Sequence, residues 1–289
     1  MNCPLCGFEK NSPYIKPYHW RKTQKHFSVV SCESCNHLYT YDAPEEDDIG
    51  PYYDSDTYIS HTDTKESLFD RVYGLVKQYM LSRKWGWIRA HVPRGTIIDY
   101  GAGSGAFVNF LNQLGRETHG YEIAEAGRKT AKENYGVNLF DPSALKSLEN
   151  KSVACFTMWH VLEHIYDPKT LIKTFHDKLK KDGILVIAVP NPESWDAKHY
   201  KEHWAAWDVP IHISHFKQNV LIPYIEKLGF SLVDKKGMPF DAFYVGLISN
   251  ENKYKSKKPF MAFLNGLKSN LSVGKEKNYS SLVYTFKKA

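Results

Sequence analysis

The sequence feature that most constrains the fold is a glycine-rich turn at residues 101–105, Gly-Ala-Gly-Ser-Gly, which begins two residues after Asp99. The apolar pair Ile97-Ile98 before it predicts the end of a buried parallel strand, and residues 106–111 after it predict a helix. Glycines at alternate positions allow a tight turn whose bare backbone lies against a ligand. Because the first N–H groups of a helix have no partner within the helix, they would face that ligand.

Two cofactors fit the spacing of this turn. Gly101, Gly103 and Ala106 satisfy the loose Gly-x-Gly-x-x-Ala fingerprint for dinucleotides. The longer pattern Asp99-x-Gly101-x-Gly103-x-Gly105 instead resembles the S-adenosylmethionine (SAM) loop of class I methyltransferases, which places an acid two residues before the first glycine, near a cationic ligand. The turn alone does not distinguish the two cofactors, so the rest of the chain has to decide.

The composition is that of an ordinary globular protein. The 289 residues suffice for one large α/β domain with a small appendage, and 42% hydrophobic and 24% charged residues are typical values. We find no apolar run long enough to span a bilayer and no signal-peptide pattern, so we expect a cytoplasmic protein without a membrane span. The net charge of +6 includes a lysine-rich stretch at residues 253–277, which favours a solvated surface over an anion-binding face.

Four of the five cysteines form two Cys-x-x-Cys pairs within residues 1–42: Cys3 with Cys6, and Cys32 with Cys35. Each pair, on a tight turn, points two thiolates at one ion, and two such turns complete a tetrahedron. In a cytosolic chain this spacing favours zinc over disulfides. Because protein fills all four positions, we expect a structural Zn²⁺ in a small zinc-ribbon module rather than a catalytic metal.

Residues 43–94 are expected to form a connector and a helical lid. The acidic run at residues 45–48 indicates an exposed joint between modules. From residue 67 to residue 91, apolar side chains recur at helical spacing, which predicts one or two amphipathic helices. The tyrosine-rich stretch between them fits either a surface loop or a lid over the active site, with three candidate lid residues: Tyr53, Tyr58 and His61.

A second strand is predicted at residues 117–122, and it ends on Glu122. A carboxylate at this place can accept hydrogen bonds from both ribose hydroxyls of an adenosine ligand. A helix at 124–135 and a third strand at 137–140 follow. An adenine ring would rest against the residues after that strand, which are Asp141, Ser143 and Ala144.

A fourth strand at residues 153–158, with Cys155 as a core residue, leads into Trp-His-Val-Leu-Glu-His at 159–164. A strand followed by this motif resembles the fourth motif of class I SAM-dependent methyltransferases of the Methyltransf_23 (UbiE/UbiG-like) type. Further matches to this family follow in order: a helix at 171–179, a fifth strand at 184–189, and the stretch 208–216 with the pattern Asp-x-Pro-x-His-x-x-x-Phe.

The resemblance covers nearly the whole chain, because family members that carry a zinc ribbon also have a tyrosine-rich segment before the glycine loop. It departs at Ala154, where an aspartate is common, and at Ile211, where an arginine is frequent. The second departure removes a side chain that would bind a substrate anion.

The resemblance implies a Rossmann-like α/β fold for residues 95–289, with a seven-stranded sheet and helices on both faces. It also implies that the last strand is inserted antiparallel beside its predecessor. We find no second nucleotide-binding half and no hydride-transfer site, so SAM is favoured over a dinucleotide. Towards the C-terminus, strands are predicted at 232–236, 241–248 and 281–286, and helices at 221–228 and 259–271.

The activity implied by the resemblance is direct transfer of a methyl group from SAM to a nucleophile. The cofactor-binding residues that it implies are Asp99, Gly101, Gly103, Gly105, Glu122, Trp159 and His160. The first four would hold the methionine end, the carboxylate after the second strand would hold the ribose, and the last two would line the floor of the cleft. Holding the acceptor in line with the methyl carbon supplies much of the rate enhancement in such a displacement.

An oxygen or nitrogen acceptor also needs a base, and histidine suits this role near neutral pH. The candidates are His160, His212 and His215, whereas His164 fits better as a residue bonded to backbone or to a neighbouring strand. His212 and His215 are three residues apart, but without a third ligand nearby in the sequence a metal pair is disfavoured. Three tryptophans would either form aromatic walls around a sugar, ring or acyl chain, or pack in the core: Trp195, Trp204 and Trp207.

The leading hypothesis is methyl transfer to an oxygen, nitrogen or carbon atom of a small molecule, such as a sugar, a glycan precursor or a quinone-like metabolite. The alternative is an RNA or ribosomal methyltransferase that uses the zinc ribbon to grip nucleic acid. Against it, the ribbon loop is not densely basic and no Asn-Pro-Pro-Tyr signature follows the fourth strand. A non-enzymatic SAM-binding protein is disfavoured by the intact loop and acid, and the oligomeric state is not disclosed by the sequence.

Overall fold

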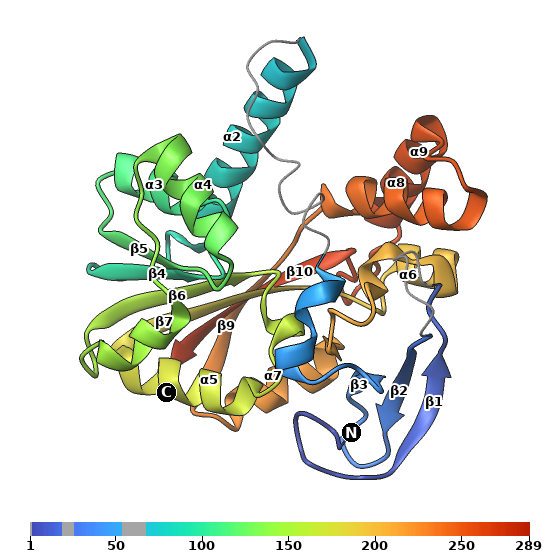
Figure 1. Ribbon diagram of the computed structural model, residues 1–289, viewed down its shortest axis with the longest axis horizontal. Helices are drawn as coiled ribbons and strands as arrows, with labels where there is room; N and C mark the ends of the chain where they lie inside the picture. Colours follow the sequence, from blue (N-terminus) through green and yellow to red (C-terminus); the bar gives the residue numbers. More distant parts are fainter. Residues whose placement is uncertain (1, 19–25, 54–67) are drawn as a thin grey trace. The chain divides into compact units, whose positions relative to one another are not determined.

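The computed structural model of the protein describes residues 2–18, 26–53 and 68–289 (Figure 1). The chain divides into two compact units, each discontinuous in sequence. Unit 1 consists of Met1–Tyr52, His160–Lys173 and Ile187–Tyr284, and unit 2 of Tyr53–Trp159, Thr174–Val186 and Thr285–Ala289. The sequence instead predicts module boundaries at residues 42 and 94 from composition and motifs, and these boundaries stay a prediction.

A small antiparallel sheet in unit 1 contains the N-terminal module. Its strand order is β1-β2-β3-β8. The last strand comes from a distant part of the chain, and its Ser214 and His215 pair with Tyr39 and Leu38. The bounds are β1 Asn11–Ile15, β2 Ser28–Cys32, β3 Leu38–Tyr41 and β8 Ser214–His215.

The larger sheet has six strands in the order β5-β4-β6-β7-β10-β9. Strand β4 pairs in parallel with β5 and with β6, as expected for an α/β sheet whose strands are linked by helices. Its central strand β6 is buried at every residue. The bounds are β4 Thr96–Tyr100, β5 Thr118–Tyr121, β6 Val153–Trp159, β7 Leu179–Pro190, β9 Phe230–Gly237 and β10 Ser281–Lys288.

Strand β10 runs antiparallel to both of its neighbours. The N–H of Asn191, just after β7, donates to the carbonyl of Ser280, just before β10, and the N–H of Met238, just after β9, donates to Ser281. The end of each neighbour therefore lies at the start of β10. This confirms the antiparallel insertion that the family resemblance implied, and it makes the sheet mixed.

The α/β fold class is confirmed, but the seventh strand is reduced to one bridge. Tyr121 of β5 and Phe140 form an isolated parallel bridge, in which Phe140 donates to Gly120 and accepts from Glu122, each at 2.9 Å. The segment is short because the preceding helix ends at Gly136 and a 3₁₀ turn begins at Pro142.

Helices connect the strands. Phe175 of α5 stacks on Phe156 of β6 with ring centroids 4.1 Å apart, which helps to cover the sheet. The predicted helical segment before the glycine turn is a single helix, α2. The α-helices are α2 Leu68–Ile88, α3 Ala106–Gln113, α4 Glu125–Tyr135, α5 Pro168–Lys178, α6 Trp195–Tyr200, α7 Gln218–Glu226, α8 Asp241–Tyr254 and α9 Pro259–Leu271.

The strand predicted at residues 241–248 is wrong, because this segment is the first half of helix α8. Helices α8 and α9 lie side by side in unit 1 (Figure 1). Their buried positions carry small or polar side chains, namely Ala242, Gly246, Ser249, Asn250 and Asn252 on α8 and Ala262, Gly266 and Ser269 on α9. Since the close contact is made by small residues, the apolar periodicity of a helix is missing from the sequence.

The three candidate lid residues of the connector are not all among the described residues. Tyr53 is an exposed residue at the end of a described segment, whereas Tyr58 and His61 lie outside the described residues. Among helices of the described segments, none is long and apolar enough to cross a membrane.

Candidate functional site

The glycine turn after β4 has the backbone that the sequence predicts. Gly101, Gly103 and Gly105 all have positive φ, at 75°, 54° and 74°, a region that glycine enters without steric cost. Gly105 is also the N-cap of α3, and as a glycine it has no side chain that could cap this helix. The turn therefore presents bare backbone and the positive end of a helix dipole to a ligand.

Glu122, after β5, is tied directly to this turn. It is only 4% exposed, and its Oε2 accepts a hydrogen bond from the Gly103 N–H at 2.7 Å while Oε1 accepts from the Ala124 N–H at 2.9 Å. A Cβ at Gly127 of α4 would lie 3.0 Å from Glu122 Cγ and 3.0 Å from the Gly103 carbonyl oxygen. The missing side chain at Gly127 thus lets α4 approach the carboxylate and the turn.

Asp99, the predicted acid before the turn, is buried at the end of β4. The Thr157 hydroxyl of β6 donates to its Oδ1 at 2.6 Å. Burial raises the pKa of Asp99 to about 6, and Glu122 adds to this, whereas the hydrogen bond from Thr157 and the charge of Lys84 act in the opposite direction. This carboxylate would gain from a positively charged ligand more than an exposed one would.

Trp159, the last residue of β6, belongs to an aromatic group in unit 2. Phe107 contacts it edge to face at 5.6 Å, and the Lys84 ammonium lies 4.7 Å from the centroid of the Trp159 ring. The Trp159 Nε1 is buried and has no hydrogen-bond partner among the residues that the structure describes. A positive charge is therefore already accommodated over these rings, in the manner of a cation–π site.

His160, in unit 1, lies between two carboxylates and has a positive φ of 59°. Its Nε2 is 3.0 Å from Asp241 Oδ2, and its Nδ1 is 3.4 Å from Glu163 Oε1. Burial would lower the pKa of His160, but the two acids outweigh burial and raise it to about 10. In this arrangement His160 holds a proton at neutral pH, so it can donate a hydrogen bond but cannot take up a second proton.

The other two predicted bases lie close together in unit 1, with ring centroids 6.4 Å apart. His215 is buried, and its Nε2 lies 3.1 Å from the Thr40 hydroxyl of β3. Burial and the nearby His212 hold the pKa of His215 well below its usual range. His212 is also buried, and its Nδ1 lies 2.9 Å from the carbonyl oxygen of Ala206.

Sequence reasoning missed Glu163 and Asp241, the two carboxylates beside His160. Glu163 stands in the Trp-His-Val-Leu-Glu-His motif, so its spacing of three residues from His160 on a turn was a usable signal. Asp241 had no such signal, because it begins the helix that the sequence predicted as a strand. His164 is bonded to backbone as expected, with its Nδ1 2.9 Å from the Ile211 carbonyl oxygen.

Two of the three tryptophans pack in the core. Trp204 and Trp207 are buried, and their Nε1 atoms donate to Asp196 Oδ2 and to the Lys201 carbonyl, each at 2.8 Å. They belong to one apolar cluster with residues of the N-terminal module, Phe27, Val29 and Leu38. Trp195 instead stacks on His199 at 4.6 Å.

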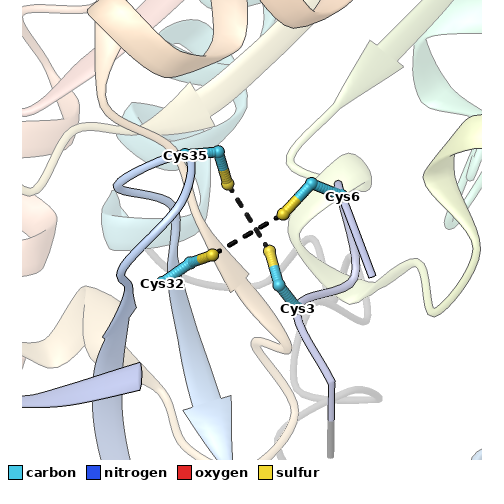
Figure 2. Close-up of side chains that lie close together, drawn as sticks. All are labelled: Cys3, Cys6, Cys32 and Cys35. Carbon is cyan, nitrogen blue, oxygen red and sulfur yellow. Dashed lines mark hydrogen bonds between the residues drawn. The ribbon is translucent and has the colours of Figure 1, made fainter. Parts of the chain in front are cut away.

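The four cysteines of the N-terminal module converge (Figure 2). Their Sγ atoms all lie within 4.8 Å of one another, and the Cys3–Cys35 and Cys6–Cys32 pairs are each 3.6 Å apart. Cys155 lies elsewhere, fully buried in β6, which confirms it as a core residue.

The two cysteine turns have the same hydrogen bonds. The Cys3 carbonyl accepts from Gly7 and the Cys32 carbonyl accepts from Asn36, and each of these two cysteines donates its N–H to the residue five positions later. Gly7 and Asn36 both have positive φ. Burial raises the pKa of Cys3 and raises that of Cys35 to about 11, so a cation is needed to keep these two sulfurs as thiolates.

Comparison with known proteins identifies the family. The methyltransferase domain family Methyltransf_23 matches residues 80–235, more than half of the chain. No curated protein is significantly similar in sequence.

Solved structures share the fold at low sequence identity. A protein from Galdieria sulphuraria described as a sarcosine dimethylglycine methyltransferase has a TM-score of 0.52 at 15% identity, over 76% of this chain and 88% of that chain. SAM-dependent methyltransferases from Archaeoglobus fulgidus and Thermotoga maritima each have a TM-score of 0.50 at 19% identity, over 73% and 76% of this chain and 94% of each of theirs. With the acid–glycine turn and Glu122 in place, the family match leads to one conclusion: the chain belongs to the Methyltransf_23 family and is a SAM-dependent methyltransferase.

Proposed function

We propose that this enzyme transfers the SAM methyl group to an oxygen, nitrogen or carbon atom of a small molecule, such as a sugar, a glycan precursor or a quinone-like metabolite. The observation that carries this choice of substrate is the packing of the N-terminal module. Its strand β3 pairs with β8, and its apolar side chains share a core with Trp204 and Trp207. Because these parts of the N-terminal module are packed inside unit 1, less of its surface is available to bind RNA.

The residues around the glycine turn fit SAM. When bound, SAM supplies a methyl group on a positively charged sulfur. Asp99 is a buried carboxylate that a cation would stabilise, and Trp159 already carries a cation over its ring. In the proposed complex Glu122 exchanges its hydrogen bond to Gly103 for bonds to the ribose hydroxyls, and Gly101, Gly103 and Gly105 hold the methionine end.

The histidines receive different roles on the acceptor side. Because His160 holds a proton between Asp241 and Glu163, it is assigned to hydrogen-bond donation and to fixing the orientation of Glu163. His215 is assigned to positioning, since its Nε2 lies against the Thr40 hydroxyl. His212 is assigned to the acceptor site through its ring nitrogen Nε2, because its Nδ1 lies against the Ala206 carbonyl.

The cysteine cluster is assigned to one structural Zn²⁺, held by Cys3, Cys6, Cys32 and Cys35. Four sulfurs at about 2.3 Å from a zinc ion lie about 3.8 Å from one another in a tetrahedron, and the two closest pairs here are 3.6 Å apart. Four protein ligands leave no position for water or substrate. The ion would therefore fix the fold of the N-terminal module and take no part in methyl transfer.

The test is methyl transfer from SAM carrying a radioactive methyl group. Purified enzyme is incubated with a fractionated small-metabolite extract and, separately, with total RNA and ribosomes. Label is expected in a small-molecule fraction and lost with Glu122→Ala, while the exposed Glu117→Ala serves as the matched control. Label in RNA but not in small molecules would favour the nucleic-acid alternative.

A further inference from the structure

Three side chains in unit 1 converge on one point outside the cofactor residues and the cysteine cluster. Potential metal-binding atoms of Glu163, His164 and His212 all lie within 4.8 Å of one another. The first two end a 3₁₀ turn, η4 Leu162–His164, and the third precedes β8. The Ile213 N–H donates to the Glu163 carbonyl at 2.8 Å, which ties the two segments together.

The two histidines have the same ring nitrogen bonded to backbone. The Nδ1 atoms of His164 and His212 each lie 2.9 Å from a backbone carbonyl oxygen, of Ile211 and Ala206 respectively. A carbonyl oxygen only accepts, so each Nδ1 carries the proton and each Nε2 keeps its lone pair. A carbonyl oxygen that fixes the tautomer in this way is characteristic of histidines that bind metals.

Glu163 supplies a carboxylate that lacks a hydrogen bond. It is 1% exposed, and within the described part of the chain neither Oε1 nor Oε2 has a hydrogen-bond partner. The Nδ1 of His160 lies 3.4 Å from Glu163 Oε1. An ionised carboxylate buried with so few partners is costly, and a bound cation would offset that cost.

We propose that Glu163, His164 and His212 bind a divalent first-row metal ion, such as Mn²⁺, Co²⁺ or Zn²⁺, whose remaining positions take a hydroxyl oxygen of the methyl acceptor. Two imidazoles and one carboxylate leave several positions on such an ion open. A closing of the side chains on the order of 1 Å would give metal–ligand bonds of about 2.0–2.2 Å. This inference rests on the proposed function and specifies that the acceptor atom is oxygen.

The site has the right chemistry for activating a hydroxyl. Glu163 and His164 follow the carboxyl end of β6, where ligands bind in open α/β sheets. A divalent ion lowers the pKa of a bound hydroxyl, so its proton passes to water near neutral pH. The oxygen then forms a bond to the methyl carbon, the carbon–sulfur bond breaks, and its electron pair stays on sulfur, giving S-adenosylhomocysteine and the methyl ether.

The first test measures metal binding without methyl transfer. The zinc content of the full-length protein is determined, and Mn²⁺ is titrated while the signal of free Mn²⁺ is followed by electron paramagnetic resonance. We expect one ion per chain beyond the ion in the cysteine cluster. In Glu163→Gln and His212→Gln the affinity for this ion should fall by more than about 100-fold, which exceeds the usual effect of changing a residue that only hydrogen-bonds to a ligand. His199→Gln, a histidine that stacks on Trp195, is the matched control and should bind like native protein.

The second test asks whether the bound ion has open positions. Acetohydroxamate, which binds metals through two oxygens, is added to protein loaded with Co²⁺, and the visible spectrum is recorded. We expect the Co²⁺ bands to shift in native protein and in the His199→Gln control. An unchanged spectrum would mean that protein atoms fill the ion's positions, and it would overturn the role in hydroxyl binding.

A SAM titration of the same samples separates this inference from the proposed function. Protein that binds SAM but takes up no ion beyond the cysteine cluster overturns the metal site and leaves the methyltransferase assignment standing. Protein that binds the ion but not SAM would support the metal site and contradict the proposed SAM site. If a variant does not fold, the native titration still decides, because the proposal requires the second ion in native protein.

Discussion

The carboxylate of Glu122 and the backbone N–H of Gly103 are joined by a hydrogen bond of 2.7 Å. The bond connects the end of β5 to the turn after β4, the two places where the sequence predicts cofactor contacts. In the proposed SAM complex the ribose hydroxyls replace Gly103 as the donors to Glu122, so the new hydrogen bonds have to offset the loss of this one.

The pH dependence of stability should reveal the buried carboxyl of Asp99. Its pKa in the folded protein is about 6, compared with 3.8 for an ordinary aspartate. The folded state therefore holds this proton more tightly, so the stability gained is complete below pH 4 and is lost as the pH rises through 6. Relative to Asp99→Asn, the free energy of unfolding of native protein should fall by up to about 3 kcal/mol between pH 4 and pH 7.

Urea denaturation of both proteins across this pH range measures the difference. Asparagine keeps the oxygen that accepts from Thr157, so the hydrogen bond at 2.6 Å has a substitute. Glu117→Gln, at an exposed acid, should give a curve parallel to that of native protein. If the free energy of unfolding of Asp99→Asn changes with pH in the same way as that of native protein, Asp99 is not buried as described.

Two glycines of the turn should respond differently to alanine. Both Gly103 and Gly105 have positive φ, but a Cβ at Gly105 would lie 2.8 Å from the Ala131 Cβ, whereas a Cβ at Gly103 would meet no atom of the described residues within 4 Å. Gly103→Ala should therefore cost only the backbone strain, about 1–2 kcal/mol. Gly105→Ala should cost about 1–3 kcal/mol more from overpacking. Thermal and urea unfolding without SAM measure both, and equal losses would contradict the close packing of α4 on the turn.

Removal of zinc should destabilise the N-terminal module. One Zn²⁺ per chain is expected at the cysteine cluster by metal analysis, and Cys32→Ser should abolish this ion because a thiolate ligand is lost. Cys155→Ala, at a buried cysteine outside the cluster, is the control that should retain it. Retention of that ion by Cys32→Ser would exclude the four-cysteine site.

Thr40 links the N-terminal module to the histidine segment. Its hydroxyl is buried, donates to the His212 carbonyl at 2.5 Å and lies 3.1 Å from His215 Nε2. Thr40→Val keeps the shape but leaves these groups unpaired, so the free energy of unfolding should fall by about 1–3 kcal/mol for each. Thr130→Val on the exposed face of α4 should change it by less than about 0.5 kcal/mol. Chemical denaturation measures both, and a Thr40→Val protein as stable as native would contradict this link.

The parts of the fold that could be predicted from the sequence are those with local signals. The glycines at 101, 103 and 105 predicted the turn because positive φ is a property of single residues. The paired cysteines predicted their own cluster, and the apolar runs predicted β4, β6 and β7. Helix α8 was mispredicted because its buried face is made of small residues such as Gly246, which leave no apolar periodicity.

The parts that could not be predicted depend on contacts between distant residues. No pattern in the sequence relates Thr40 to His215, or Thr157 to Asp99, because these pairs meet only through the pairing of strands. The same is true of the proposed metal ligands Glu163 and His164, which the sequence does not relate to His212. The Ile213–Glu163 hydrogen bond joins the two segments that carry these side chains.

The most direct test of the central claim is calorimetric titration of the purified, zinc-loaded protein with SAM and with S-adenosylhomocysteine. Native protein should bind in the micromolar range. Asp99→Ala and Glu122→Ala should each weaken binding by about 10- to 100-fold, which corresponds to the loss of interactions with a charged group, while Glu117→Ala should bind like native protein. No binding of either ligand by folded native protein would contradict the assignment of residues 99–105 and Glu122 as the SAM site.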